Sequence, residues 1–141
     1  MTATAAHDNG AGGGCVFCAI AASLAPAQIV ARWPDALAIV PLNPVTDGHL
    51  LVLPTSHTPD AAYDPDVTAA TMRRAAELAQ GAGPANLITS IGPEATQTVA
   101  HLHIHLVPRR THDGLHLPWT VPTPVAAEAQ TTSDDPTGAW L

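Results

Sequence analysis

Basic and aromatic side chains are scarce in this sequence. Its 141 residues include five Lys and Arg against twelve Asp and Glu, so the formal net charge is −7. A protein that binds a nucleic-acid polymer needs a basic face to neutralise phosphates, and this composition argues against such a partner. It does not exclude a small phosphorylated ligand, which a few local donors can hold. Because aromatic residues make up only 4% of the chain, the core must be built from Leu, Val, Ile and Ala.

The sequence also has no long apolar run and no recognisable targeting segment. No stretch approaches the roughly 20 apolar residues of a membrane-spanning helix. The first residues, MTATAAHDNGAGGG, contain neither a basic region nor an apolar run, so they do not resemble a signal peptide. We therefore expect a cytoplasmic protein without a membrane partner. The length fits one domain, large enough to bury a core without disulfides.

Cysteine occurs only twice, as Cys15 and Cys18 in a C-x-x-C motif. In a cytoplasmic protein, a close cysteine pair is more often a metal or redox site than a structural disulfide. A structural zinc ion needs four ligands, so the pair alone supplies half of a site. The alternative is a reduced pair packed under the first helix.

Hydrophobic patterning predicts two helices and five strands. The first helix covers residues 15–24 and ends before Pro26, and the second begins after Asp64, with Pro65 in its first turn. The predicted strands are 28–33, 36–40, 49–54, 85–91 and 99–107. Mostly short connections favour an antiparallel α+β sheet. The polar ends of the chain predict a disordered arm over residues 1–14 and a C-terminal tail over residues 122–141.

The segment HLHIHLVPRR contains three histidines at alternate positions, His101, His103 and His105, with apolar residues between them. In a strand, alternate side chains share a face, so the histidines would point one way and the apolar residues would pack the other way. Three unrelated surface histidines are one alternative, and a single metal ion bound by all three is another. The metal ion is disfavoured because the outer two Cα atoms would lie about 13 Å apart. Imidazoles at this spacing can instead line an extended anion such as a phosphate chain, and they titrate near neutrality.

The residues beside the histidines favour phosphate chemistry. Gln97 and Thr98 come just before the predicted strand, and their amide and hydroxyl can donate to phosphate oxygens or to a leaving group. Arg109 and Arg110 follow the strand and are interpreted as a solvated strand end without a catalytic role.

The run GPEATQTVAHLHIHLVPR resembles the signature of the histidine-triad (HIT) superfamily, and especially its fragile-histidine-triad branch. NPVTDGHLLVLPTSH resembles the second conserved element of that family, and CVFCAIAAS resembles the N-terminal opening of its bacterial members. The resemblance extends from Cys15 to Arg110. It implies a HIT-like α+β fold, with a five-stranded antiparallel sheet and two helices in a domain spanning residues 15–121, and a homodimer.

The resemblance also implies an activity. HIT proteins bind nucleotides and cleave at the α-phosphate through a nucleotidyl-histidine intermediate, so we expect a hydrolase or nucleotidyl transferase for a dinucleoside polyphosphate or a related purine nucleotide. The catalytic residues that the resemblance implies are His103 as the nucleophile, His105, His101 and Thr98. The nucleotide-binding residues that it implies are His49, Asn43, Gln97, Thr98 and His105.

Three positions depart from the family pattern. Thr96 stands where the family usually has Gly, which allows close backbone approach to phosphate. Pro41 stands where many members hold the ribose hydroxyls with an acidic residue or Asn, and Asn43 is the nearby candidate for that contact. Ser90 stands where Asn or Gln is common. These departures concern ribose contacts and substrate size.

His57 and His101 could complete a zinc site with Cys15 and Cys18. Two thiolates and two imidazoles form a ligand set that suits structural zinc. The resemblance supports the same set, because several bacterial HIT proteins and the related galactose-1-phosphate uridylyltransferases have such a site. A zinc ion held by His101 would also brace the segment that leads to His103.

Three other functions remain open from the sequence. One is a nucleoside phosphoramidase, which would cleave P–N instead of P–O–P bonds. Another is a nucleotide-binding module without turnover, and the third is a metalloprotein whose histidine triad holds zinc or copper. The complete H-x-H-x-H motif favours an enzyme, because binding alone does not require the central nucleophile.

Overall fold

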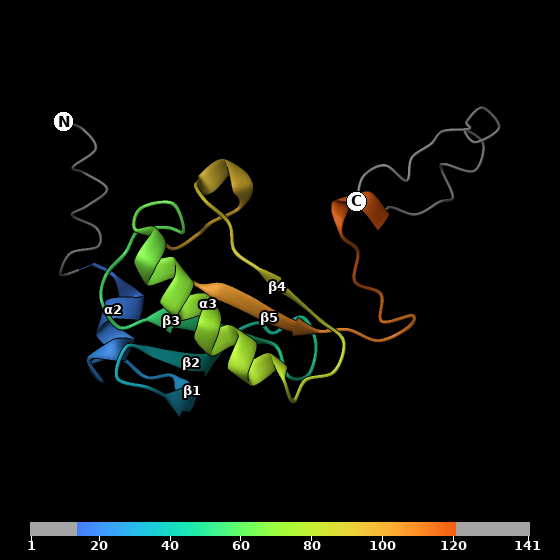
Figure 1. Cartoon of the computed structure of the whole chain (residues 1–141), viewed down its shortest axis with the longest axis horizontal. Helices are drawn as coiled ribbons and strands as arrows, with labels where there is room; N and C mark the ends of the chain where they lie inside the picture. The colour runs from blue at the N-terminus through green and yellow to red at the C-terminus, as the bar shows by residue number, and fades with distance from the viewer. Residues whose placement is uncertain (1–13, 121–141) are drawn as a thin grey trace. The chain divides into compact units, whose positions relative to one another are not determined.

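The structure, a computed structural model, describes residues 14–120 (Figure 1). The chain divides into two compact units, the first ending at Arg110 and the second beginning at Thr111. The elements of the first unit are α2 (Val16–Ala21), β1 (Gln28–Arg32), β2 (Ala36–Val40), β3 (Leu50–Pro54), α3 (Pro65–Ala79), β4 (Ala85–Ile88), the 3₁₀ turn η1 (Pro93–Ala95) and β5 (Ile104–Pro108). Among the described residues, none of the helices is both long and apolar enough to cross a membrane.

The predicted arm and tail fall outside this description. Of residues 1–14 only Gly14 is described, and residues 122–141 are not. The described part of the second unit contains the 3₁₀ turn η2 (Pro118–Thr120). The hydroxyl of Thr120 accepts a hydrogen bond from the amide of Leu117 at 2.8 Å, which closes this turn.

The five strands form one antiparallel sheet in the order β1-β2-β3-β5-β4, which confirms the predicted α+β class. In the register of the central strands, Leu37 of β2 lies opposite Leu53 of β3, and Leu51 of β3 lies opposite His105 of β5. Residues that lie opposite one another in a sheet project from the same face. His105 therefore shares a face with Leu51.

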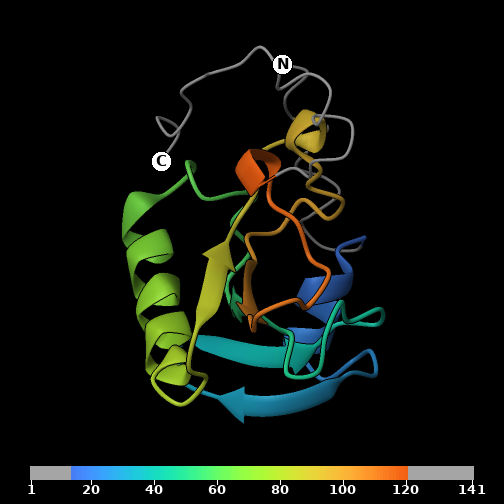
Figure 2. The ribbon, with the colours of Figure 1, turned by 90° about the vertical axis from the view of Figure 1, so that its right-hand side faces the viewer.

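The two faces of the sheet carry different helices (Figure 2). On one face, residues such as Leu37 and Leu51 pack with Phe17 and Ile20 of α2. On the other face, residues that alternate with them pack against Ala75 of α3; these are Ala38, Val52 and Ile104. The alternation follows from the period of two in a strand. It puts the triad histidine His105 on the α2 face, away from α3.

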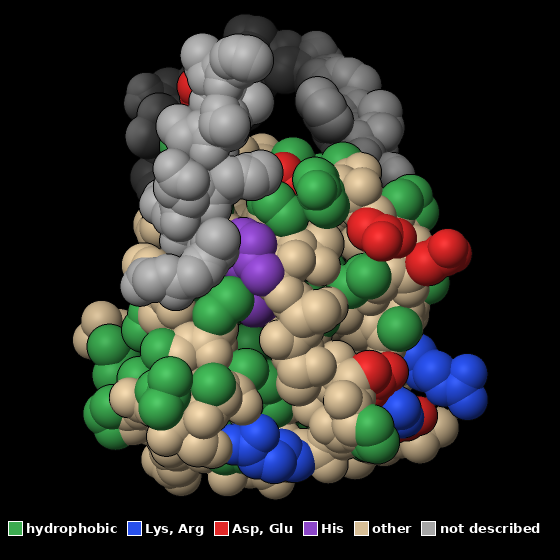
Figure 3. Space-filling view, turned by 90° about the vertical axis from the view of Figure 1, so that its left-hand side faces the viewer, with side chains coloured by type: hydrophobic (Ala, Val, Ile, Leu, Met, Phe, Trp, Pro, Cys, Tyr) green, Lys and Arg blue, Asp and Glu red, His purple; other side chains and the backbone are tan. Residues whose placement is uncertain are grey.

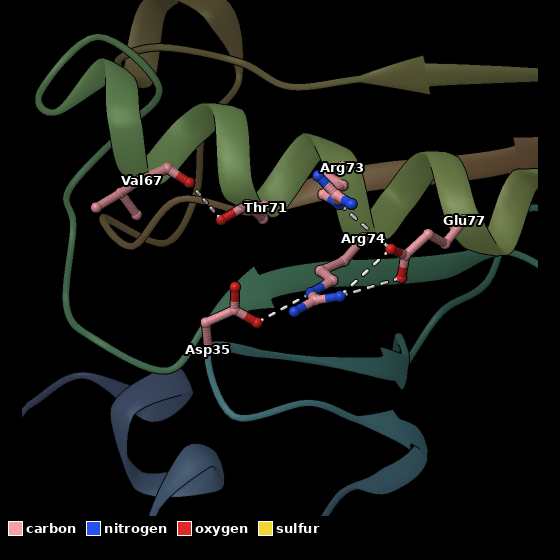
Figure 4. A network of polar contacts seen from close by, with 6 residues as sticks. All are labelled: Asp35, Val67, Thr71, Arg73, Arg74 and Glu77. Atoms are coloured by element: carbon pink, nitrogen blue, oxygen red, sulfur yellow. Dashed lines mark hydrogen bonds and ion pairs between the residues drawn. The ribbon is translucent and has the colours of Figure 1, made fainter.

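Helix α3 begins as predicted, because the carboxylate of Asp64 accepts hydrogen bonds from the first backbone amides and Pro65 occupies the first turn. Its polar side is joined to the turn between β1 and β2, where the Arg74 guanidinium lies 3.0 Å from Asp35 and 3.3 Å from Glu77 (Figure 4). Such exposed pairs each stabilise a fold by less than about 1 kcal/mol. The helix is held mainly by its apolar face.

Two predicted strands are shorter in the structure than in the sequence pattern. The strand predicted over 99–107 begins only at Ile104, because the amide of Leu102 bonds to the carbonyl of Thr58 at 2.6 Å instead of joining the sheet. The strand predicted over 85–91 ends at Ile88. Beyond that point the hydroxyl of Thr89 donates to the carbonyl of His103 at 2.8 Å, so a side chain takes the acceptor that a longer strand would have used.

Candidate active site and metal centre

A cavity of about 810 Å³ opens on the α2 face of the sheet. Its lining includes the imidazoles of His49, His103 and His105, with the ring of Phe17 at one side. The volume falls in the range of sites for small organic ligands. Figure 3 shows one face of the molecule, on which histidine atoms reach the surface among uncharged side chains.

His103 is held with one ring nitrogen free. Its Nδ1 lies 2.8 Å from the carbonyl oxygen of His101. Because a carbonyl can only accept, the hydrogen sits on Nδ1 and the lone pair is left on Nε2. Burial lowers the pKa of His103, and the bond to the His101 carbonyl opposes this only in part. The imidazole is therefore neutral at neutral pH, which is the form that a nucleophile requires.

His105 presents the opposite tautomer, because its proton assignment is set by His49. The amide of Val45 donates to Nδ1 of His49 at 3.0 Å, so the hydrogen of His49 is on Nε2. That Nε2 lies 3.0 Å from Nδ1 of His105, which accepts and thereby keeps its own hydrogen on Nε2. Gly48 makes the turn before His49 possible, since its φ is +88° and a Cβ there would come within 3.0 Å of Pro108.

Burial also lowers the pKa of His49 and His105, that of His105 to about 4. For His105, the neighbouring His103 and His49 lower it further. The ring centroids of His103 and His105 are 5.3 Å apart. The cavity thus combines a bare nitrogen on His103 with an N–H donor on the adjacent His105, and both rings are uncharged.

The loop before the triad brings two hydroxyls to the cavity, those of Thr96 and Thr98. Thr96 has a left-handed backbone, with φ +75°, which is unfavourable for a β-branched residue. The Gln97 side chain does not line the cavity. Its oxygen accepts from the amide of Gly92 at 2.8 Å, and its nitrogen donates to the carbonyls of Pro59 and Val99 at 2.7 and 3.0 Å. Gln97 therefore orders the loop, and its contact with nucleotide stays a prediction.

Pro41 and Asn43 both line the cavity, on the segment between β2 and β3. Asn43 thus offers an amide on the side where Pro41 has no polar group. Ser90 is not among the lining residues. Ribose binding by Asn43 remains a prediction.

Cys15, Cys18, His57 and His101 form a group whose ligand atoms all lie within 4.8 Å of one another and could hold a metal ion. Nδ1 of His101 lies 3.3 Å from Sγ of Cys15 and 3.6 Å from Sγ of Cys18. Nδ1 of His57 lies 3.4 Å from Sγ of Cys18 and 3.3 Å from Nδ1 of His101. Tetrahedral zinc, with bonds of about 2.3 Å to sulfur and about 2.0 Å to nitrogen, separates its ligands by roughly 3.3–3.8 Å. These spacings fit such an ion.

The protonation of the cluster also suits a cation. Nε2 of His101 lies 2.9 Å from the carbonyl of Pro54, so the hydrogen is on Nε2 and Nδ1 turns a lone pair toward the sulfurs. Burial lowers the pKa of His101 to about 4, and burial together with Cys15 raises that of Cys18 to about 11. A metal ion would reverse the cost of a buried thiolate, because it supplies the missing positive charge.

The sequence did not indicate several groups that shape the site. Phe17 contacts both His101 and His103 edge-on, with ring centroids 5.7 and 5.2 Å apart. The carbonyl of Pro54 and the amide of Val45 set the tautomers of His101 and His49. Backbone groups carry no residue-specific signal, and Phe17 in CVFC is indistinguishable from an ordinary core residue.

Comparison with known proteins identifies the family. The HIT domain family model matches residues 23–112. An uncharacterized HIT-like protein of Mycobacterium tuberculosis is 40% identical over 108 residues, covering 72% of this chain and 75% of that protein. The adenylylsulfatase HINT3 of Arabidopsis thaliana is 32% identical over 108 residues, covering 72% of this chain and 55% of that protein. The bifunctional bis(5'-adenosyl)-triphosphatase/adenylylsulfatase FHIT of the same plant is 34% identical over 95 residues, covering 62% and 53%.

Solved structures agree with this assignment. A zinc-bound histidine triad family protein from Mycobacterium smegmatis has a TM-score of 0.62 and 40% identity, with 72% of this chain and 79% of that chain covered. A HIT family hydrolase from Clostridium thermocellum has a TM-score of 0.64 and 28% identity, with 73% and 96% covered. Family match, identity and fold therefore agree that this chain belongs to the HIT family.

Proposed function

We propose that this protein is a nucleotide hydrolase or nucleotidyl transferase that cleaves at an α-phosphate through a nucleotidyl intermediate on His103. The observation that carries the proposal is the free Nε2 of His103, fixed by the His101 carbonyl at 2.8 Å and facing a cavity of nucleotide size. Relatives that hydrolyse adenylyl sulfate or bis(5'-adenosyl) triphosphate support the same class of reaction.

In the first step, the electron pair on Nε2 of His103 attacks the α-phosphorus. An N–P bond forms, the bond from phosphorus to the leaving group breaks, and the leaving atom takes its electron pair. The N–H of His105 donates to a phosphate oxygen, and the hydroxyl of Thr98 donates to the leaving group. The positive charge that develops on the attacking ring is met by the His101 carbonyl, which accepts from Nδ1.

In the second step, water or another acceptor attacks the same phosphorus. The N–P bond breaks, its electron pair returns to Nε2 of His103, and the nucleotide leaves with the new oxygen. Splitting one displacement into two avoids a single crowded reaction between two anions. His49 keeps the proton of His105 on the nitrogen that faces phosphate, through their 3.0 Å hydrogen bond.

The second part of the proposal is that Cys15, Cys18, His57 and His101 bind one structural zinc ion. When bound, zinc would supply the cation that buried thiolates need and would fix the side chain of His101. The spacing of the four ligand atoms and the zinc-bound relative from Mycobacterium smegmatis support this assignment. A cytoplasmic location and a homodimer belong to the same proposal as predictions.

Replacement of the nucleophile tests the proposed function. We expect His103→Asn to lower turnover of an adenosine phosphoramidate and of a dinucleoside polyphosphate by at least about 10³-fold. AMP should still bind, because most of the cavity is unchanged. His116→Asn, which alters an exposed histidine outside the cavity lining, is the matched control. Near-native turnover by His103→Asn would remove His103 from its role, and a loss of both binding and folding would require His103→Gln.

A further inference from the structure

The charged side chains of this chain avoid the cavity. All five basic residues in the sequence are arginines, at positions 32, 73, 74, 109 and 110, and none of them lines the cavity. No Asp or Glu among the described residues lines it either. The lining is apolar or uncharged polar apart from its histidines.

Most of these arginines are engaged elsewhere. Arg73 and Arg74 lie on α3, which covers the opposite face of the sheet, and both pair with Glu77 (Figure 4). Arg32 donates to the Ser23 hydroxyl at 3.5 Å, and Arg109 donates to Asn86 at 2.7 Å. On the face shown in Figure 3, arginine side chains lie at the lower and right-hand edges, apart from the visible histidine. The chain therefore holds its positive charges away from the bound phosphates.

The histidines of the cavity do not replace the missing cations. His49 and His105 share one hydrogen bond, and burial keeps both rings neutral at neutral pH. They can donate one N–H to a phosphate oxygen, which suits a single phosphoryl group with one negative charge. A chain of phosphates brings further charges, and each would be desolvated without a counter-ion. The formal charge of −7 adds a long-range repulsion.

We propose that this cavity selects substrates by the charge of the leaving group, favouring phosphoryl groups that carry a neutral amine over those that carry a polyphosphate. The inference rests on the proposed function and names its substrate class as phosphoramidates. In the balanced reaction, the P–N bond breaks and the amine nitrogen keeps the electron pair. The nitrogen takes a proton from the Thr98 hydroxyl, which regains one from solvent. Water then supplies the oxygen that releases the nucleotide from His103.

Binding of nucleotides tests the charge dependence apart from turnover. We expect the affinity measured by calorimetry in magnesium-free buffer to fall several-fold from AMP to ADP and again from ADP to ATP. The fall should shrink as sodium chloride rises from 0.02 M to 0.3 M, because the Debye length shortens from roughly 20 Å to under 10 Å. Affinity that rises with each added phosphate would overturn the proposal.

A charge added at the cavity tests it by gain of function. Leu42 lines the cavity and is 97% exposed, whereas Leu24 is 82% exposed and does not line it. Leu42→Arg should raise kcat/KM for diadenosine triphosphate, relative to an adenosine phosphoramidate, by about tenfold. Leu24→Arg adds the same charge to the chain and should leave that ratio within about twofold. Leu42→Gln removes the leucine without adding charge and should also leave the ratio unchanged.

The outcomes separate this inference from the function on which it rests. If the wild-type protein turns over neither substrate although it binds AMP, the proposed function fails. If it turns over both but prefers the triphosphate, or if Leu42→Arg and Leu24→Arg shift the ratio equally, the function stands and charge selection is wrong. If phosphoramidate is preferred and only Leu42→Arg reduces the preference, both stand.

Discussion

His101 joins the metal cluster to His103, the proposed nucleophile. Its side chain turns Nδ1 toward Cys15 at 3.3 Å, and its carbonyl accepts the Nδ1 hydrogen of His103 at 2.8 Å. Its ring is fixed from the far side by the carbonyl of Pro54 at 2.9 Å. A single residue thus anchors both the cluster and the tautomer of the adjacent imidazole. The cluster is therefore positioned to influence the chemistry without contacting substrate.

The metal cluster gives a prediction on composition and stability. Protein purified without chelator should contain about one zinc ion per chain, and Cys15→Ser should lower both the zinc content and the melting temperature, because metal binding contributes to folding. Elemental analysis and thermal unfolding measure the two effects. Val16→Ala, at the neighbouring exposed position, is the control and should keep its zinc. A wild type that is metal-free and equally stable would exclude the site.

The His49–His105 pair gives a prediction on acid stability. Because burial lowers the pKa of His105 to about 4, the unfolded chain binds more protons than the folded one between that value and about 6.5. The free energy of unfolding should therefore fall as the pH is lowered through this window. His105→Asn keeps an acceptor for the N–H of His49 but does not titrate, so its stability should fall less steeply. His116→Asn is the matched control.

Urea unfolding at several values between pH 7 and pH 4.5 measures these slopes, with zinc content determined at each pH. Acid also weakens metal binding, so the informative quantity is the difference in slope between wild type and His105→Asn. An identical slope for the two proteins, at identical zinc content, would exclude the assigned shift.

Thr96 gives a prediction on backbone strain. A non-glycine residue with a left-handed backbone loses about 1–2 kcal/mol, and glycine loses about 0.5–1 kcal/mol through its greater freedom when unfolded. Thr96→Gly should therefore leave the free energy of unfolding unchanged or raise it by up to about 1 kcal/mol. Thr98→Gly, in the same loop without a positive φ, should lower it. Equal destabilisation by both changes in chemical denaturation would show that Thr96 carries no strain.

The sequence predicted the parts of the site that depend on side-chain type and period. The alternation around His105 indicated which face it occupies, and the C-x-x-C spacing with His57 and His101 indicated the cluster that the structure brings within 4.8 Å. It failed where the backbone leaves the sheet. Alternation continues through residues 99–103, but their hydrogen bonds go to Thr58 and Val99 instead of a neighbouring strand.

Tautomers were also beyond the sequence, because carbonyl and amide partners set them. The hydrogen of His103 depends on the carbonyl of His101, and that of His105 depends on the amide of Val45 through His49. Gln97 illustrates the same limit from the other side. Its amide suits a phosphate ligand by type, yet three backbone groups engage it.

The last prediction is that turnover needs no divalent ion acting as a Lewis acid at the histidine triad. Magnesium prefers carboxylate and phosphate oxygens, and Glu94 is the only acidic residue between Leu78 and Asp113. No carboxylate of the described residues lines the cavity, so charge on phosphorus is met by N–H and O–H donors, His105 and Thr98 among them. The triad does not converge on one ion, since His101 turns toward the cysteines while His105 bonds to His49.

Activity on a phosphoramidate should therefore persist during a brief treatment with EDTA, short enough for the structural zinc to stay bound. Zinc content is measured on the same sample, because loss of zinc would disturb His101 and lower activity by a separate route. A phosphoramidate is the suitable substrate, since a polyphosphate itself binds magnesium and its supply would change with the chelator. If activity disappears at once, magnesium restores it and zinc content is unchanged, a metal-assisted mechanism replaces the one that relies on imidazole and hydroxyl groups alone.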